Sequence, residues 1–151
     1  MLSDDAFGNQ LTDTKRALEA WAERHHTAAE IIIDEGAGFW RIQVAPSEAS
    51  LCSVELVLRH DRCYDLIVLE ASVEDQPIEQ FEFFVELFDA IAQGLPVVRT
   101  YHSLATQQLL GKTMTVPLAN GEAWYIEDLS ALGQQRGLGD AVVTETRFAP
   151  Y

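Results

Sequence analysis

The stretch from Ile78 to Gln93, IEQFEFFVELFDAIAQ, decides how the chain must fold. Pro77 precedes it and Gly94 follows it, which are residues expected just before a helix and at its left-handed end. On such a helix the acidic residues share one narrow sector, and most apolar residues lie opposite. Phe83 and Leu87 fall outside that main stripe, so the apolar surface is wider than the roughly 100° that packing against one surface requires. A neighbour must therefore cover Phe83 and Leu87.

Two neighbours could provide this cover. The first is a helix expected over residues 12–28, capped by Thr12 or Asp13, with Leu18 and Trp21 on its apolar side. The second is another copy of the chain, in which case the same flank would be the interface of a homodimer. The sequence leaves both alternatives open.

The remaining segments have the character of β-strands. Leu51–Arg59 alternates between apolar and polar residues, and Leu66–Leu69 is continuously apolar, as in a strand buried on both faces. Asn120-Gly121 is a strong hairpin signal, and pairing around it places Val116 opposite Tyr125. We expect an α+β fold, an antiparallel meander sheet of about six to seven strands with two main helices packed on it.

Length and charge restrict the class of protein. The chain has 151 residues, 48% of them hydrophobic, with 10 Lys and Arg against 24 Asp and Glu, a net charge of −14. This length suits a single domain over residues 1–151, which can bury roughly 70% of its unfolded surface. The charge argues against nucleic acid and anionic membranes, because both attract basic proteins. No secretory signal and no apolar run of about 20 residues is visible, so a cytoplasmic protein is predicted.

The two cysteines are expected to be reduced. Cys63 lies beside the turn of a predicted hairpin, whereas Cys52 lies at its far end. That separation exceeds the roughly 7 Å between Cα atoms that a disulfide tolerates. Two structural thiols fit a cytoplasmic location.

Two cofactor motifs are incomplete. Gly111-Lys112-Thr113 is similar to the tail of a phosphate-binding loop, but Thr106 stands where the pattern requires glycine. Gly137-Leu138-Gly139 begins like a dinucleotide fingerprint, but Val142 occupies the third glycine position. The acidic face of the 78–93 helix lacks the histidine that accompanies carboxylates in helical metal sites, and is expected to be solvated. We therefore predict no cofactor and no metal.

One interpretation is a small-molecule-binding protein or enzyme with an apolar pocket between the sheet and the helices. Its expected lining is aromatic with one histidine: Trp21, His25, Phe81, Tyr101 and Trp124. His102, near the end of a strand, is the best single candidate for a general base. The sequence leaves open whether the protein is an enzyme.

The interpretation that we favour is an acidic binding, adaptor or chaperone-like protein that associates with itself. Its negative field would attract a basic protein or an unfolded segment. Small secretion chaperones are similar in size, in acidity and in the early order of helix, strands and helix, although no residue motif links this chain to them.

Overall fold

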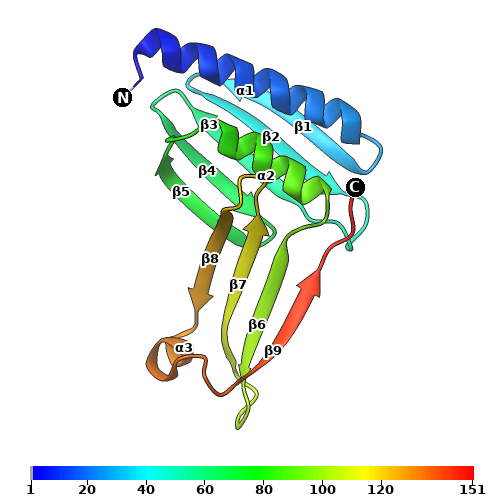
Figure 1. Ribbon diagram of the computed structural model, residues 1–151, viewed down its shortest axis with the longest axis vertical. Helices are drawn as coiled ribbons and strands as arrows, with labels where there is room; N and C mark the ends of the chain where they lie inside the picture. The colour runs from blue at the N-terminus through cyan, green and yellow to red at the C-terminus, as the bar shows by residue number, and fades with distance from the viewer. Residues whose placement is uncertain (1) are drawn as a thin grey trace.

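The computed structural model describes residues 2–151, which form three helices and nine strands in two antiparallel sheets (Figure 1). The elements, in chain order, are α1 (Asp4–His25), β1 (Ala29–Gly36), β2 (Phe39–Pro46), β3 (Val54–Arg59), β4 (Cys63–Val68), β5 (Ala71–Pro77), α2 (Glu82–Ala92), β6 (Val97–Ser103), β7 (Leu109–Pro117), β8 (Ala123–Leu129), α3 (Ala131–Arg136) and β9 (Ala141–Arg147). The expected α+β class is confirmed.

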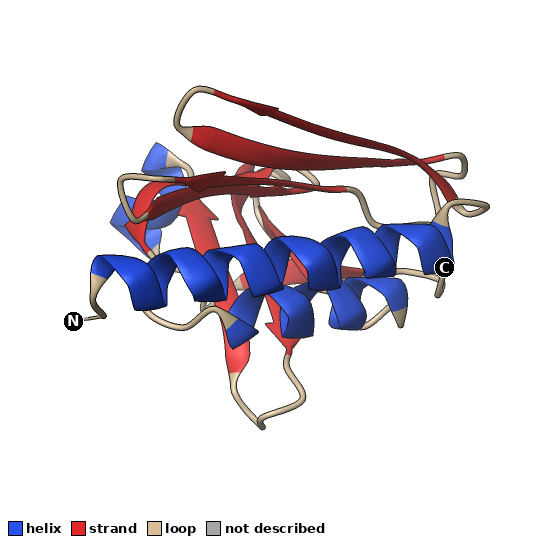
Figure 2. Cartoon of the chain, turned by 90° about the horizontal axis from the view of Figure 1, so that it is seen from above, coloured by secondary structure: helices blue, strands red, loops and turns tan. Residues whose placement is uncertain are grey.

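The first sheet is a meander in the order β1-β2-β3-β4-β5. Alternate residues such as Trp40 and Ile42 of β2 and Leu56 of β3 are buried, because they face the helices. Figure 2 shows α1 and α2 together on one side of this sheet. The buried side chains of the sheet and of both helices form one hydrophobic cluster.

The prediction of one sheet with six to seven strands is wrong. After α2 the chain builds a second sheet in the order β8-β7-β6-β9, which extends away from the first (Figure 1). The first sheet stops at β5, where the register shifts between Tyr64 and Leu66 and Asp75 adopts a positive φ of 54°. These irregularities and the following Pro77 prevent a further strand from pairing there.

α1 begins eight residues earlier than the sequence indicates. Its N-cap is Ser3, whose hydroxyl accepts a hydrogen bond from a main-chain amide in the first turn, and residues 12–13 lie inside the helix. The extra turns are stabilised by tertiary packing, because the rings of Phe7 and Phe81 lie 5.2 Å apart. Local capping signals could not reveal that contact.

The broad apolar surface of α2 is covered within a single chain. Leu87 is fully buried, and the half-buried Phe83 packs beside Tyr64, with 6.2 Å between ring centroids. α1 lies along α2, and the Trp21 indole N–H donates a 3.1 Å hydrogen bond to the Phe88 carbonyl. Leu87 therefore presents no exposed surface to another copy.

The β7–β8 hairpin turns where Asn120-Gly121 indicates, with Gly121 at a φ of 87°. The predicted register is wrong by one residue, because Val116 pairs with Trp124 rather than Tyr125. Five residues, 118–122, connect the two strands, and within this loop the Leu118 amide donates a hydrogen bond to the Glu122 carbonyl. Trp124 therefore contacts the core, and Tyr125 is 55% exposed.

The segment after β9 returns to the first sheet and the helices. The Ala149 amide donates to the Ser50 carbonyl, and the Tyr151 amide donates to the Ala92 carbonyl. Gly94, at the end of α2 with a φ of 75°, lies so close that an added Cβ would stand 2.7 Å from the Phe148 carbonyl oxygen. These contacts fasten the second sheet to the rest of the molecule.

We expect Leu87→Ala to lower the free energy of unfolding by about 2–5 kcal/mol, because it leaves a cavity in a fully covered site. Phe83→Ala should cause a smaller loss, since that ring is only half buried. Glu86→Gln on the same helix should change stability by less than about 0.5 kcal/mol. Urea unfolding of the three variants gives the comparison, and equal losses at Leu87 and Glu86 would contradict the described packing.

Candidate functional site

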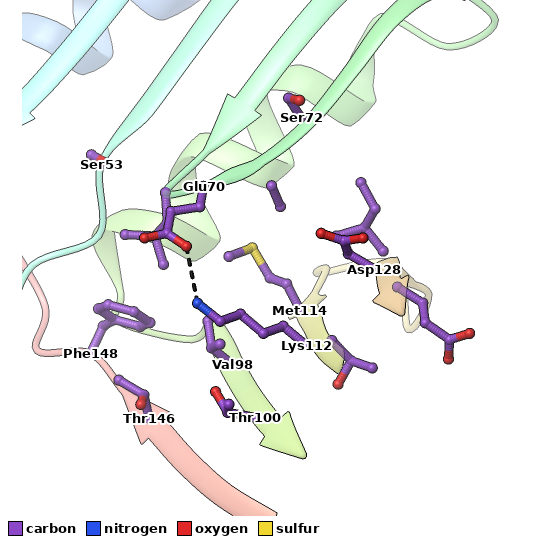
Figure 3. A pocket seen from close by; sticks show the side chains of 15 residues that line it. Ser53, Glu70, Ser72, Val98, Thr100, Lys112, Met114, Asp128, Thr146 and Phe148 are labelled. Carbon is purple, nitrogen blue, oxygen red and sulfur yellow. Dashed lines mark hydrogen bonds and ion pairs between the residues drawn. The ribbon is translucent and has the colours of Figure 1, made fainter. Parts of the chain in front are cut away.

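An open cleft of about 700 Å³ lies where the two sheets meet (Figure 3). It is lined by side chains from the first sheet, from the second sheet and from the loop residues next to their strands: Ser53, Leu69, Glu70, Ala71, Ser72, Val98, Thr100, Lys112, Thr113, Met114, Ile126, Glu127, Asp128, Thr146 and Phe148. The cleft is the candidate functional site because it brings apolar and charged groups from separate parts of the chain together.

The floor of the cleft is an apolar row across the second sheet. Val98 pairs with Met114, and Met114 pairs with Ile126, so the three side chains point to the same face of β6, β7 and β8. Phe148 and Leu69 also belong to the lining and pack against the hydrophobic core. A ligand here would meet a surface that is already fixed by strand register.

A second row, beside the apolar one, is polar. Thr100 pairs with Lys112, and Lys112 pairs with Asp128. Figure 3 shows Lys112 reaching across the cleft to Glu70, with 3.1 Å between the ammonium nitrogen and a carboxylate oxygen. Both side chains are substantially exposed, and such pairs contribute only about 0–1 kcal/mol. The ion pair can therefore exchange for contacts with a ligand at little cost.

Glu70 is placed by an unusual turn. Leu69 and Glu70 form the two-residue connection between Val68 and Ala71, and Leu69 has a φ of 55°. This backbone region favours glycine, and a bulky side chain there is strained by about 1–3 kcal/mol. The Leu69 amide donates a 3.1 Å hydrogen bond to the Ser53 carbonyl, which holds the turn in position. Glu70 thus projects from a fixed turn into the cleft.

The charges of the lining favour a cation. Two carboxylates, Glu70 and Asp128, lie on the same side of the cleft as the one ammonium group, Lys112, so this side carries a formal charge of −1 (one minus two). Glu127 also borders the cleft, but it alternates to the other face of β8, where its carboxylate accepts a 2.9 Å hydrogen bond from the Tyr125 hydroxyl. The hydroxyl groups of the lining can both donate and accept hydrogen bonds. Histidine and cysteine are absent from the lining, so its serines have no imidazole beside them to act as a base.

The predicted pocket residues do not gather at the cleft, and none of the five lines it. Trp21 is fully buried, and its ring lies 4.8 Å from that of His25. Phe81 instead packs against Phe7 near the start of α1, and Phe7 and Trp21 are about 21 Å apart along the helix axis at 1.5 Å per residue. Tyr101 on β6 and Trp124 on β8 belong to the second sheet. The structure thus brings Trp21 and His25 together and leaves the other three elsewhere.

His102 lies on β6, between Leu109 of β7 and Val142 of β9. It is half buried and stands outside the lining of the cleft. Within residues 2–151 its ring has no hydrogen bond to a carboxylate that would orient it as a base.

The cleft residues were missed because each resembles an ordinary strand residue in the sequence. The one available signal is Lys112, a charged residue in line with Met114 and Val116 on an otherwise apolar strand face. The incomplete motif Gly111-Lys112-Thr113 contains the same lysine, but there it would belong to a phosphate-binding loop. The structure places Lys112 inside strand β7, which excludes such a loop.

Both cysteines are free, as predicted. Cys52 is fully buried, and burial raises the pKa of its thiol to about 12. Cys63 is half buried on β4. Among residues 2–151, no three His, Cys, Asp or Glu side chains group closely enough to hold a metal ion.

The chain is an α+β protein with two antiparallel sheets. Two helices cover one face of the first sheet, and an open cleft lies where the two sheets meet. Comparison with known protein families, with curated proteins and with solved structures finds no match to any of them. None of the helices in residues 2–151 has both the length and the apolar character needed to cross a bilayer.

His25 gives a testable pH dependence. Its pKa is lowered, first by burial and then by the nearby Arg24 charge, although Asp89 partly opposes this. Because the unfolded chain binds the proton more readily, the stabilisation from neutral His25 is present above about pH 6.5 and is lost as the pH falls below it. We expect the free energy of unfolding to decrease from about pH 7.5 to 5.5, and His25→Gln to reduce that decrease. Urea unfolding at both pH values measures this decrease. If His25→Gln shows the same decrease as the unchanged protein, His25 is not its source.

Proposed function

We propose that the protein is a binding or adaptor protein, chaperone-like in action, which holds a basic extended segment of another polypeptide in the cleft between its sheets. The observation that carries the proposal is the lining itself, in which Glu70, Asp128 and Lys112 border an apolar floor. Its supporting context is a chain with a net charge of −14.

An extended segment fits the two parallel rows of the cleft. Successive side chains of an extended chain point to opposite sides, so alternate residues can address different surfaces. Apolar residues of the segment would contact Val98, Met114 and Ile126. The basic residues between them would reach Asp128 on β8, or replace Lys112 as the partner of Glu70.

The charge of the whole molecule supports capture of a basic ligand. A net charge of −14 raises the local concentration of cations and accelerates their association. This attraction weakens as salt screens it, over a Debye length of about 8 Å at physiological ionic strength. Binding in the cleft should therefore decrease as salt increases.

A small cationic molecule is the second candidate ligand. The volume of about 700 Å³ lies within the range of roughly 300–1,000 Å³ that is usual for ligand pockets. His102 is not part of the cleft lining, so it could act as a general base only on a molecule that extends beyond the cleft.

A cytoplasmic location remains part of the proposal. Its support is the pair of free cysteines, since unpaired thiols are typical of reducing compartments.

The test uses two fluorescent ten-residue peptides, one alternating lysine with valine and the other alternating glutamate with valine. We expect fluorescence anisotropy to show binding of the lysine peptide, weakened about tenfold, or about 1.4 kcal/mol, by the double variant Glu70→Lys, Asp128→Lys. The matched control, Glu23→Lys with Glu30→Lys, makes the same change of charge at exposed residues outside the cleft.

Equal weakening by both double variants would mean that only the overall charge matters and would refute a site in the cleft. Equal affinity for the two peptides would refute selection of basic segments. If native mass spectrometry instead shows a bound small molecule that is lost in the Glu70→Lys, Asp128→Lys variant, the second candidate is supported.

A further inference from the structure

The two sheets have four edge strands in the part of the chain that the structure describes, and three of them are protected against pairing with another strand. β1 carries three carboxylates, Glu30, Asp34 and Glu35. β5 contains a register shift, a residue at positive φ and a terminal proline. β8 carries Glu127 and Asp128. Charges, irregular backbone and proline are the usual ways to keep a strand edge from pairing.

The fourth edge, β9, is less protected, because its two charged side chains, Glu145 and Arg147, form an ion pair with each other. Its seven residues, AVVTETR, pair with β6 in a continuous register without a bulge, and they contain neither proline nor lysine. Val142 and Val143 are 48% and 49% exposed, although valine favours the interior of sheets. Among residues 2–151, no strand pairs with the outer edge of β9, so its main-chain groups there have no strand partner.

The charge of this edge also differs from that of the molecule. Glu145 is the only acid in β9, and it forms ion pairs with Arg147 at 2.6 Å and Arg99 at 3.3 Å. Counting these three side chains, the local charge is +1 (two minus one), on a chain with a net charge of −14. Two β9 edges, each with a local charge of only +1, repel each other less than two edges lined with carboxylates would.

We infer that β9 is an interaction surface for a second copy of this chain, and that two copies join by antiparallel pairing of their β9 strands. With the two-fold axis at Thr144, Val142 lies opposite Thr146 of the other copy, and Val143 lies opposite Glu145. Arg147 lies opposite Ala141, so no like charges face each other directly. The sequence of β9 is therefore compatible with pairing to an identical strand. Such pairing converts two four-stranded sheets into one continuous sheet of eight strands.

Neighbouring side chains enlarge the contact only modestly. Val142 lies beside His102, whose partner on the other side is Leu109, 43% exposed. Seven residues from each copy fall well short of the roughly 20–30 residues a side found in standard interfaces. The association is therefore reversible and depends on protein concentration.

The first test is sedimentation velocity of the full chain from about 1 to 500 µM. We expect a reversible dimer that tightens between about 50 and 500 mM salt, because salt screens the repulsion between two copies of an acidic chain. Val143→Lys should weaken the dimer at least about tenfold. The matched control is Ile32→Lys, which adds the same charge at a 44% exposed residue of the edge strand β1 and should leave dimerisation unchanged.

The second test fixes the register. Directly opposed residues in an antiparallel pair have Cα atoms about 4.5–5.5 Å apart, within reach of a disulfide. In a Cys63→Ser background, Thr144→Cys should therefore give a covalent dimer under mild oxidation, whereas Ile32→Cys should not.

A monomer at every concentration and salt, or equal effects of Val143→Lys and Ile32→Lys, overturns the inference. A dimer in which Thr144→Cys fails to cross-link overturns the placement of the two-fold axis. These outcomes are independent of the proposed function, since salt has opposite effects on the dimer and on binding of the lysine peptide. Val143 also lies outside the cleft, so Val143→Lys should leave peptide affinity unaltered.

Discussion

The packing of one indole ring connects the parts of this molecule. Trp21 is fully buried on α1, donates its N–H to the Phe88 carbonyl on α2, and has its ring 5.8 Å from that of Tyr151. α1 and α2 rest on the first sheet, and Tyr151 follows the strand that completes the second. Since the cleft exists only where the two sheets meet, its shape depends on this buried contact, although Trp21 does not touch it.

The parts of the fold that depend on local signals could be read from the sequence. The helix expected over residues 78–93 is present as Glu82–Ala92 with Gly94 at a positive φ beyond it, and the hairpin turns at Asn120-Gly121. The number of sheets could not be foreseen. β9 pairs with β6, and nothing in either sequence specifies a partner so distant along the chain. Pairing of that kind is decided by which surfaces remain uncovered after the helices have packed.

The candidate site was harder to anticipate than the fold. Glu70 lies in a hairpin of the first sheet and Lys112 in the middle of the second, and only the junction of the sheets brings them within 3.1 Å. The aromatic residues that the sequence suggested for a pocket include Trp21 and Phe81, which are buried near opposite ends of α1. Hydrophobic patterning identifies side chains that avoid water. It does not distinguish those that fill the interior from those that border a cleft.

The contact between Trp21 and Tyr151 has a kinetic consequence. These residues are 130 positions apart (151 minus 21), and the pairing of β6 with β9 is also distant in sequence. Proteins dominated by such non-local contacts fold slowly, because loop closure lowers chain entropy before the contact compensates for it. The meander of β1 to β5 has near neighbours only, so it can form early, and the junction of the two sheets is expected to be completed last.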